Sequence, residues 1–246
     1  KEYTILIFKE KTMKKAKKNF TSFVIAFLLI FGLILMFNNQ IKNSLIKNTS
    51  EGYNLSQLKR DDVINNKNVS TTFDFKSVQP ISSEAVIKAK LENKKLPVIG
   101  AIAIPEVGIN LPVFKGLSND ALLWGAGTTK DNQEMGSGNY GLASHYTKQE
   151  DLLFTPLLKV KINDEIYLTD LDYVYHYKVS LKREVSPSEV QWLDEIPNKE
   201  LVTLVTCGDL SAETRIIIQG ELQERIPINE IPEDIRNAFE LEQLTY

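Results

Sequence analysis

The chain has 246 residues, of which 43% are hydrophobic and 25% charged, and its formal net charge is −3. This balance is typical of a globular protein with one domain and some additional segments. The small net charge gives no general attraction to nucleic acid. A single cysteine excludes a disulfide framework within the chain and a multi-cysteine zinc site.

The N-terminal part contains a segment that is long and apolar enough to cross a membrane. Four lysines between residues 14 and 18 precede the uncharged stretch Phe20–Phe37. About 18 residues at a rise of about 1.5 Å span roughly 27 Å, close to the thickness of a bilayer core. No small-residue cleavage pattern follows, so we interpret residues 20–41 as an uncleaved signal-anchor rather than a signal peptide or a core helix.

The lysine cluster predicts the orientation of this anchor. By the positive-inside rule, residues 1–19 lie in the cytoplasm and the rest lies outside, as in a single-pass type II protein of the cell membrane. Residues 1–12 precede Met13, the first methionine. We therefore treat them as candidate upstream sequence and give them no structural weight.

Residues 42–80 are rich in Asn, Ser, Lys and Thr, which indicates a linker with at most a short helix near 55–64. Residues 81–246 are predicted to form the folded domain. A helix is expected from Ser82 or Ser83 to Lys94, because either serine can cap it and three apolar residues recur at helical spacing. These are Val86, Ile87 and Leu91.

After Pro97 the pattern changes to short runs rich in Val, Ile, Leu and Tyr, separated by Gly, Pro, Asn and Asp. The predicted strands are 98–104, 107–113, 140–144, 165–169, 173–184, 201–207 and 215–223. Seven or eight strands with little helix indicate a mostly β protein, either a closed barrel or a sandwich. A helical turn is expected at 188–193. A C-terminal amphipathic helix is expected over 232–244, with Ile235, Ala238, Phe239 and Leu241 on one face.

Cys207 ends an apolar strand, and an outward-facing domain rarely keeps one unpaired thiol unless the thiol is used. A cysteine nucleophile needs a partner that controls its proton, usually histidine. His145 also ends a predicted strand, whereas His176 lies within a strand at a position that suggests a solvent-facing side chain. His145 is therefore the candidate partner.

Arg215 is the candidate third member of the site. Cys207 ends one strand and Arg215 begins the next, so a hairpin would bring both residues to the same rim. A guanidinium there stays charged, favours the thiolate and can stabilise an oxyanion. Asp209 is also close in sequence, but capping of its own loop is the expected role for it.

These residues resemble a known family. Thr203-Leu204-Val205-Thr206-Cys207, followed by an arginine eight residues later, resembles the signature of sortases, the cell-wall transpeptidases of Gram-positive bacteria. Several upstream segments are similar to class A sortases of the streptococcal type. They are 96–100, 102–105, 108–117, 125–128 and 142–145, so the resemblance covers roughly residues 82–223.

The resemblance implies a closed eight-stranded β-barrel with a few short helices and the catalytic residues His145, Cys207 and Arg215. It implies cleavage of a Leu-Pro-X-Thr-Gly sorting signal between Thr and Gly, through a thioester on Cys207. Transfer to an amine of a cell-wall precursor would follow. The implied substrate-binding positions are Ala143, Thr206, Val185, Pro187, Val190 and Val205, of which the apolar ones would otherwise be plain barrel core.

The implied partners are surface proteins that carry the sorting signal and a peptidoglycan precursor similar to lipid II, with no nucleic acid. Some class A sortases use calcium, and Glu195 resembles one ligand position. The expected partner segment, 118–123, lacks an acidic cluster. Because calcium requires six to eight oxygen ligands, we predict no required metal or other cofactor.

Three other functions remain open from the sequence. A pilus-polymerising sortase usually carries an Asp-Pro-aromatic lid before the barrel and often a second membrane span. Residues 42–80 contain no Asp-Pro, and no hydrophobic span follows Phe37. A cysteine hydrolase would resolve the thioester with water. A surface domain that binds peptides without catalysis would need no reactive thiol.

Overall fold

The computed structural model describes residues 2–53 and 58–239, with side chains from residue 19 onward. The chain divides into two compact units, 1–42 and 43–246. The first unit consists mainly of helix α1, Glu2–Met36. Within α1, Asn19–Met36 has a mean hydropathy of 2.4 and no buried side chain in the structure, so its length and composition suffice to cross a membrane.

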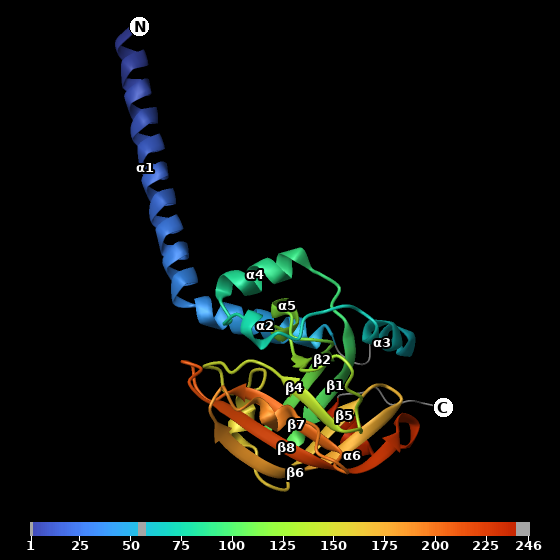
Figure 1. The fold of residues 1–246 in the computed structure, drawn as a ribbon. Coiled ribbons are helices and arrows are strands. Elements are labelled where there is room, and N and C mark those ends of the chain that lie inside the picture. The colour runs from blue at the N-terminus through green and yellow to red at the C-terminus, as the bar shows by residue number, and fades with distance from the viewer. Residues whose placement is uncertain (1, 54–57, 240–246) are drawn as a thin grey trace. The chain divides into compact units, whose positions relative to one another are not determined.

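Eight strands form a closed barrel within the described part of the second unit, as predicted (Figure 1). Their order around the barrel is β1-β2-β3-β4-β7-β8-β6-β5, and β5 closes it by pairing with β1. The strands are β1 Val98–Ile104, β2 Ile109–Phe114, β3 Ala126–Thr128, β4 Asn139–Ala143, β5 Glu165–Thr169, β6 Tyr173–Val185, β7 Leu201–Cys207 and β8 Arg215–Pro227.

Seven strands agree with the prediction to within a few residues, whereas β3 was missed. It has only three residues, Ala-Gly-Thr, which is too short and too poor in β-branched residues to show a strand pattern. It pairs in parallel with β2 and antiparallel to β4. Without β3 the barrel would have an open edge between those two strands.

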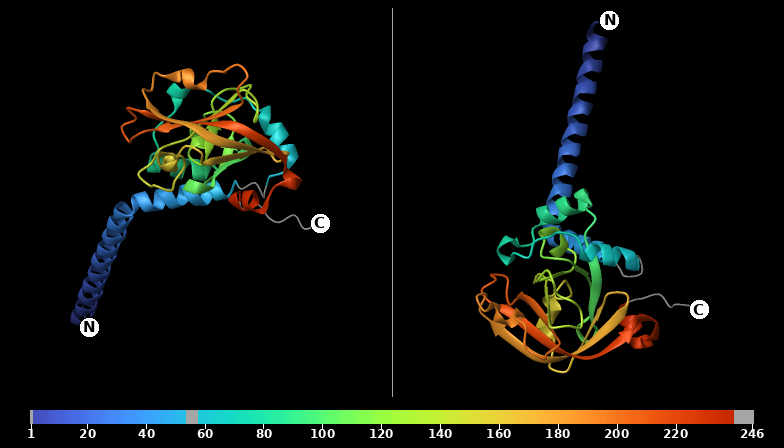
Figure 2. Two further views of the ribbon diagram at one scale, coloured as in Figure 1. Left: turned by 90° about the horizontal axis from the view of Figure 1, so that it is seen from below. Right: turned by 45° about the vertical axis from the view of Figure 1, so that its right-hand side comes forward.

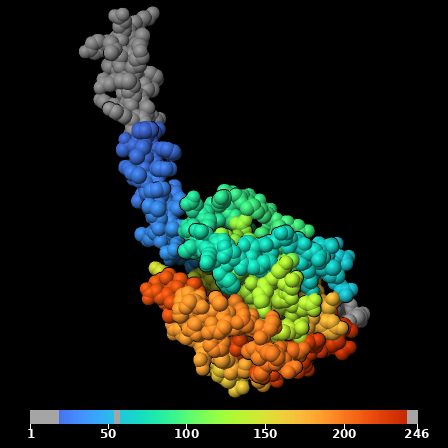
Figure 3. Space-filling model, viewed as in Figure 1, coloured from blue at the N-terminus to red at the C-terminus, as the bar shows by residue number. Residues whose placement is uncertain are grey.

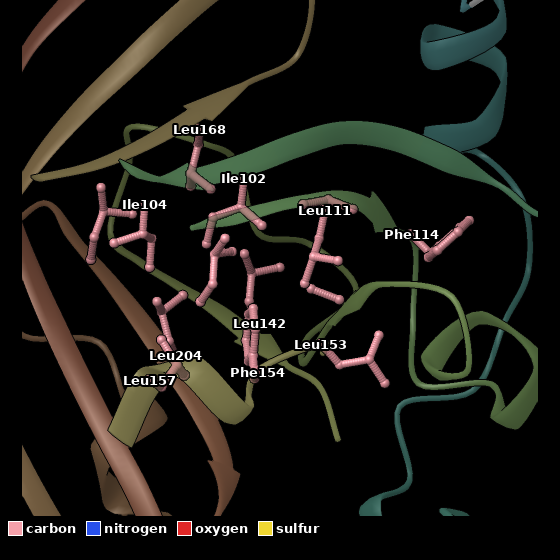
Figure 4. Packing of buried hydrophobic residues seen from close by; sticks show 14 of the residues in the cluster. Ile102, Ile104, Leu111, Phe114, Leu142, Leu153, Phe154, Leu157, Leu168 and Leu204 are labelled. Atoms are coloured by element: carbon pink, nitrogen blue, oxygen red, sulfur yellow. The ribbon is translucent and has the colours of Figure 1, made fainter. Parts of the chain in front are cut away.

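Alternate residues of the strands fill the barrel interior (Figure 4). Ile102 and Ile104 of β1, Leu142 of β4, Leu204 of β7 and Leu168 of β5 are fully buried there. Phe154 and Leu157 also join this cluster; Leu157 lies in the 3-10 helix η4, Thr155–Lys159. The other face of the same strands packs outward, because successive side chains of a strand point to opposite faces.

Strands β6 and β8 are each 13 residues long and pair along most of their length. Figure 2 shows this antiparallel ribbon curving across the barrel. The outer face of β1 and β5 is covered by the C-terminal segment, where Ile235 and Phe239 pack with Ala101 and Ala103. Helix α6 is Glu233–Ala238, within the predicted 232–244; residues 240–246, including Leu241, lie outside the described residues.

The segment 42–80 differs from a plain linker. It contains the second half of α2 (Asn38–Glu51), α3 (Arg60–Lys67) and the 3-10 helix η2 (Phe75–Ser77). Ile46 and Val63 are buried, and the Asn66 side chain donates to the carbonyl of Val98. The predicted short helix near 55–64 starts later, at Arg60, and residues 54–57 lie outside the described part. The segment is mostly polar, so no sequence pattern indicated that its few apolar residues, such as Ile46, pack into the folded domain.

Helix α4, Ser83–Glu92, forms where predicted and is capped by Ser82, whose hydroxyl accepts from the Ala85 N–H. Its buried residues are Val86 and Ala89, however, and Ile87 and Leu91 are exposed. The helical turn expected at 188–193 is the 3-10 helix η5, Val190–Leu193. Several short helices were not predicted, among them α5, Asn119–Leu122, and the 3-10 helix η3, Pro105–Val107.

Candidate active site

The parallel pairing of β4 and β7 places His145 next to Cys207. Ala143 is the register partner of Val205. Two hydrogen bonds extend this contact beyond the strand end, from Ser144 N to Val205 O (3.2 Å) and from Thr206 Oγ1 to Ser144 O (3.0 Å). Continued by two residues, this register sets His145, two residues past the end of β4, opposite Cys207, the last residue of β7, and paired strands lie about 5 Å apart. Phe154 N donates to the His145 carbonyl and fixes the backbone there.

The antiparallel pairing of β7 and β8 adds Arg215 to the same rim. Cys207 and Arg215 are register partners, and Gly208 N donates to Thr214 O across the hairpin. Arg215 Nη1 donates to the carbonyls of Ala212 (2.8 Å) and Thr214 (2.9 Å). Among the described residues no acceptor binds its Nε or Nη2. The guanidinium is therefore held by its own loop with two nitrogens left for another group.

Desolvation favours the neutral forms of both the Cys207 thiol and the His145 imidazole. Desolvation lowers the pKa of His145 from 6.5 to about 4. Desolvation also raises the pKa of the Cys207 thiol; the Arg215 charge opposes this shift and the Asp209 charge adds to it. Both shifts disfavour the charged form, as expected for groups removed from water. Both shifts therefore favour the thiol and the neutral imidazole over the thiolate–imidazolium pair at neutral pH, and in that form the thiol gives up its proton as it attacks.

An apolar cluster leads away from these residues along the outer face of β4, β7, β8 and β6. Ala143, Val205 and Val185, three of the predicted substrate-binding residues, pack together with Ile217 of β8. Each lies an even number of residues from His145, Cys207 or Arg215 along its own strand or in register with it. Because alternate side chains of a strand point to the same face, the cluster and the three polar residues share one face. Pro187 and Val190 are exposed on the β6–β7 connection and stand outside the cluster.

Thr206 directly precedes Cys207 in β7, so its side chain points to the opposite face of the strand. Its side chain is 2% exposed, and its hydroxyl donates to the Ser144 carbonyl. The hydroxyl thus supports the backbone that leads to His145. His176 lies elsewhere: its ring nitrogens contact Glu165 and Glu224, and its ring stacks on Tyr167. It belongs to the β5–β6–β8 side of the barrel.

Among the described residues, no hydrogen bond or ion pair joins Glu195 to the segment 118–123. Its carboxylate accepts from the ammonium of Lys130 and from the Asn139 backbone N–H. Although burial alone would raise its pKa, these two donors lower it overall. Lys130 also donates to the Leu193 carbonyl. No group of three or more His, Cys, Asp or Glu side chains suited to a metal occurs within the described residues.

Sequence reasoning missed Lys130 because it lies in the loop between β3 and β4, and β3 itself was not recognised. The β6–β7 connection that carries Glu195 runs from residue 186 to 200 and is seen at the surface in Figure 3 (orange). Trp192 and Leu193 of this connection pack against the apolar cluster, and the Arg183 guanidinium lies 5.5 Å from the Trp192 ring centroid. The connection therefore borders the cluster on the side of β6.

The chain is similar to known proteins over most of its length. Residues 102–223 match the sortase domain family. The chain is 42% identical to sortase A of Streptococcus agalactiae serotype III (strain NEM316) over 92% of this chain and 95% of that protein. It is 41% identical to sortase A of Listeria monocytogenes over 80% of this chain and 89% of that protein. The crystal structure of Listeria monocytogenes sortase A matches with a TM-score of 0.54 and 37% identity, covering 59% of this chain and 99% of that one. The chain therefore belongs to the sortase A family of cysteine transpeptidases.

Proposed function

We propose that this transpeptidase cleaves a Leu-Pro-X-Thr-Gly sorting signal between Thr and Gly and transfers the surface protein to an amine of a cell-wall precursor. The observation that carries the proposal is the row formed by His145 just past the end of β4, Cys207 at the end of β7 and Arg215 at the start of β8, next to an apolar cluster on the same face. The Leu-Pro part of the signal would lie on Ala143, Val185 and Val205. Pro187 and Val190 would contact it from the β6–β7 connection.

The roles of the three polar residues follow from their chemistry. As Cys207 Sγ attacks the Thr carbonyl carbon, its proton passes to His145, and the oxyanion is stabilised by the free nitrogens of Arg215. The C–N bond then breaks, His145 protonates the leaving Gly amine, and a thioester remains on Cys207. The acceptor amine attacks this thioester and gives its proton to His145. Expulsion of the Cys207 sulfur, which is reprotonated, restores the resting pair.

The proposed location is the cell membrane, with the catalytic unit on the outer side. The support is the apolar part of α1 together with the lysines before it. We further propose that no calcium is required. The Lys130 ammonium already neutralises Glu195 and links the β3–β4 loop to the β6–β7 connection, which is what a bound cation would do there.

Incubation of the full chain in detergent with a Leu-Pro-X-Thr-Gly peptide, with and without an amine acceptor, tests the proposal. We expect amine-dependent transfer and a thioester that hydroxylamine traps, both abolished in Cys207→Ala. Cleavage at the same rate with and without amine would instead identify a cysteine hydrolase. Peptide binding without cleavage, retained in Cys207→Ala, would identify a non-catalytic binding domain. Polymerisation of pilin-like subunits in preference to transfer to a wall amine would identify a pilus-polymerising sortase.

A further inference from the structure

Three polar side chains are buried on the same outer face of β4, β7 and β8, away from the strand ends that carry the catalytic candidates. Asn139, Thr203 and Gln219 are 1%, 0% and 6% exposed. Thr203 and Gln219 are register partners, and Gly141, two residues after Asn139, is the register partner of Thr203 on the other side. Buried polar groups are costly unless they are hydrogen-bonded, so the partners of these side chains indicate what they do.

The three side chains form one continuous chain of hydrogen bonds. Gln219 Nε2 donates to Thr203 Oγ1 (3.1 Å), and Thr203 Oγ1 donates to Asn139 Oδ1 (2.6 Å). The Thr203 hydroxyl both accepts from Gln219 and donates to Asn139, and such coupled bonds strengthen each other in a buried setting. The Thr203 hydroxyl is the central link, because it is the only hydroxyl that joins the two amides.

The remaining amide hydrogens all end on the β6–β7 connection. Asn139 Nδ2 donates to the carbonyls of Trp192 (2.9 Å) and Asp194 (2.8 Å), and Gln219 Nε2 also donates to the Trp192 carbonyl (3.2 Å). These backbone groups belong to a connection whose surface residues, such as Val190, are exposed. Buried side chains of β4 and β8 therefore hold the connection on the sheet through hydrogen bonds to its backbone.

We propose that Asn139, Thr203 and Gln219 are positioning residues that hold the β6–β7 connection in the geometry that binds the sorting-signal peptide. The inference rests on the proposed function, because it assigns the connection as one wall of the peptide site. The three residues act through the backbone of Trp192 and Asp194, and they do not touch the peptide. Loss of the network loosens the wall, so peptide binding weakens while the reacting residues keep their places.

Thr203→Val is the first test, because valine has nearly the same shape and removes only the hydroxyl. It leaves Asn139 Oδ1 without its donor and one Gln219 N–H without its acceptor. We expect the KM for the peptide to rise about tenfold, which corresponds to about 1.4 kcal/mol of binding free energy. The kcat and the rate of Cys207 alkylation by iodoacetamide should stay within about twofold of the wild type. Thr203→Ser, which keeps the hydroxyl, should restore the KM.

Thr169→Val is the matched control. Thr169 is also 0% exposed, and its hydroxyl donates to the Tyr173 carbonyl (2.8 Å) in the β5–β6 turn. Both variants remove one buried hydroxyl and should lower Tm, but only Thr203→Val should change KM. An equal KM in the two variants would show that Thr203 contributes only to stability. A fall in kcat at unchanged KM would show that Thr203 acts on the catalytic residues instead, and would also overturn the inference. If Thr203→Val does not fold, Gln219→Met, which removes two donors and keeps the side-chain length, replaces it.

Acrylamide quenching of tryptophan fluorescence in the full chain gives a readout that needs no activity. Trp124 is 2% exposed and contributes little quenching, so the quenched signal reports mainly on Trp192. The quenching constant should increase in Thr203→Val and stay at the wild-type value in Thr169→Val. No increase in Thr203→Val would overturn the inference. If the wild type fails to cleave the peptide, the proposed function fails, but the quenching result still decides whether the network holds the connection.

Discussion

Cys207 and Arg215 are register partners at the last rung of the β7–β8 ladder. The loop between them is short, and the Arg215 side chain closes on it by donating to the Ala212 carbonyl. Ala212 adopts a left-handed conformation with φ of 58°, which a residue with a side chain adopts only at a cost. The loop thus fixes the guanidinium beside the thiol before any substrate arrives.

Arg215→Lys should lower kcat for peptide transfer by about 100-fold, the usual loss when an oxyanion donor is removed. A lysine ammonium cannot both hold the loop carbonyls and present two further planar donors to a substrate oxygen. The kcat and KM of the transfer reaction measure the effect. Transfer at the wild-type rate in this variant would show that Arg215 only shapes the loop.

His145→Ala should abolish transfer, whereas His176→Ala should leave kcat within about twofold of the wild type. The reason is topological, since His145 follows the strand β4 that pairs in parallel with the strand of Cys207, whereas His176 contacts Glu165 and Glu224 on another side of the barrel. Single-turnover thioester formation, followed by mass spectrometry, compares the two. An inactive His176→Ala of normal Tm would contradict the assignment.

The lowered pKa of His145 makes stability depend on pH in a defined window. Between the unfolded value of 6.5 and the folded value of about 4, the unfolded chain binds a proton at this residue and the native chain does not. The free energy of unfolding therefore falls as the pH decreases through this window. Urea titrations at pH 7 and pH 5 should show a smaller decrease for His145→Gln than for the wild type. Equal decreases would place the native pKa of His145 near its ordinary value.

We expect removal of calcium to leave activity unchanged, because the Lys130 ammonium already pairs with the Glu195 carboxylate. We expect EDTA to have no effect on kcat or KM. Lys130→Ala should raise the KM several-fold, a modest effect since the ion pair is partly solvated. Lys159→Ala, which removes a lysine paired with Glu150 at the surface, is the control. A calcium-dependent wild type would refute the proposal of a metal-free site.

The sequence by itself predicted most of the strands and the candidate reacting groups. Runs of apolar residues predicted seven of the strands, the TLVTC segment ending in Cys207 indicated the nucleophile, and the hairpin to Arg215 follows from local spacing. These features depend on neighbours a few residues apart. The polar composition of residues 42–80 and the brevity of β3 left both of them unrecognised, since neither has enough apolar residues to create a pattern.

Only the tertiary structure decided which distant residues meet. Asn139 and Leu201 are register partners although 62 residues separate them, and this parallel pairing brings His145 level with Cys207. A parallel pair needs a long crossover and leaves no local signature in the sequence. The contact of Lys130 with Glu195 and the Asn139–Thr203–Gln219 network also leave no local signature in the sequence. Their side chains come from different strands and loops, so closure of the barrel brings them together.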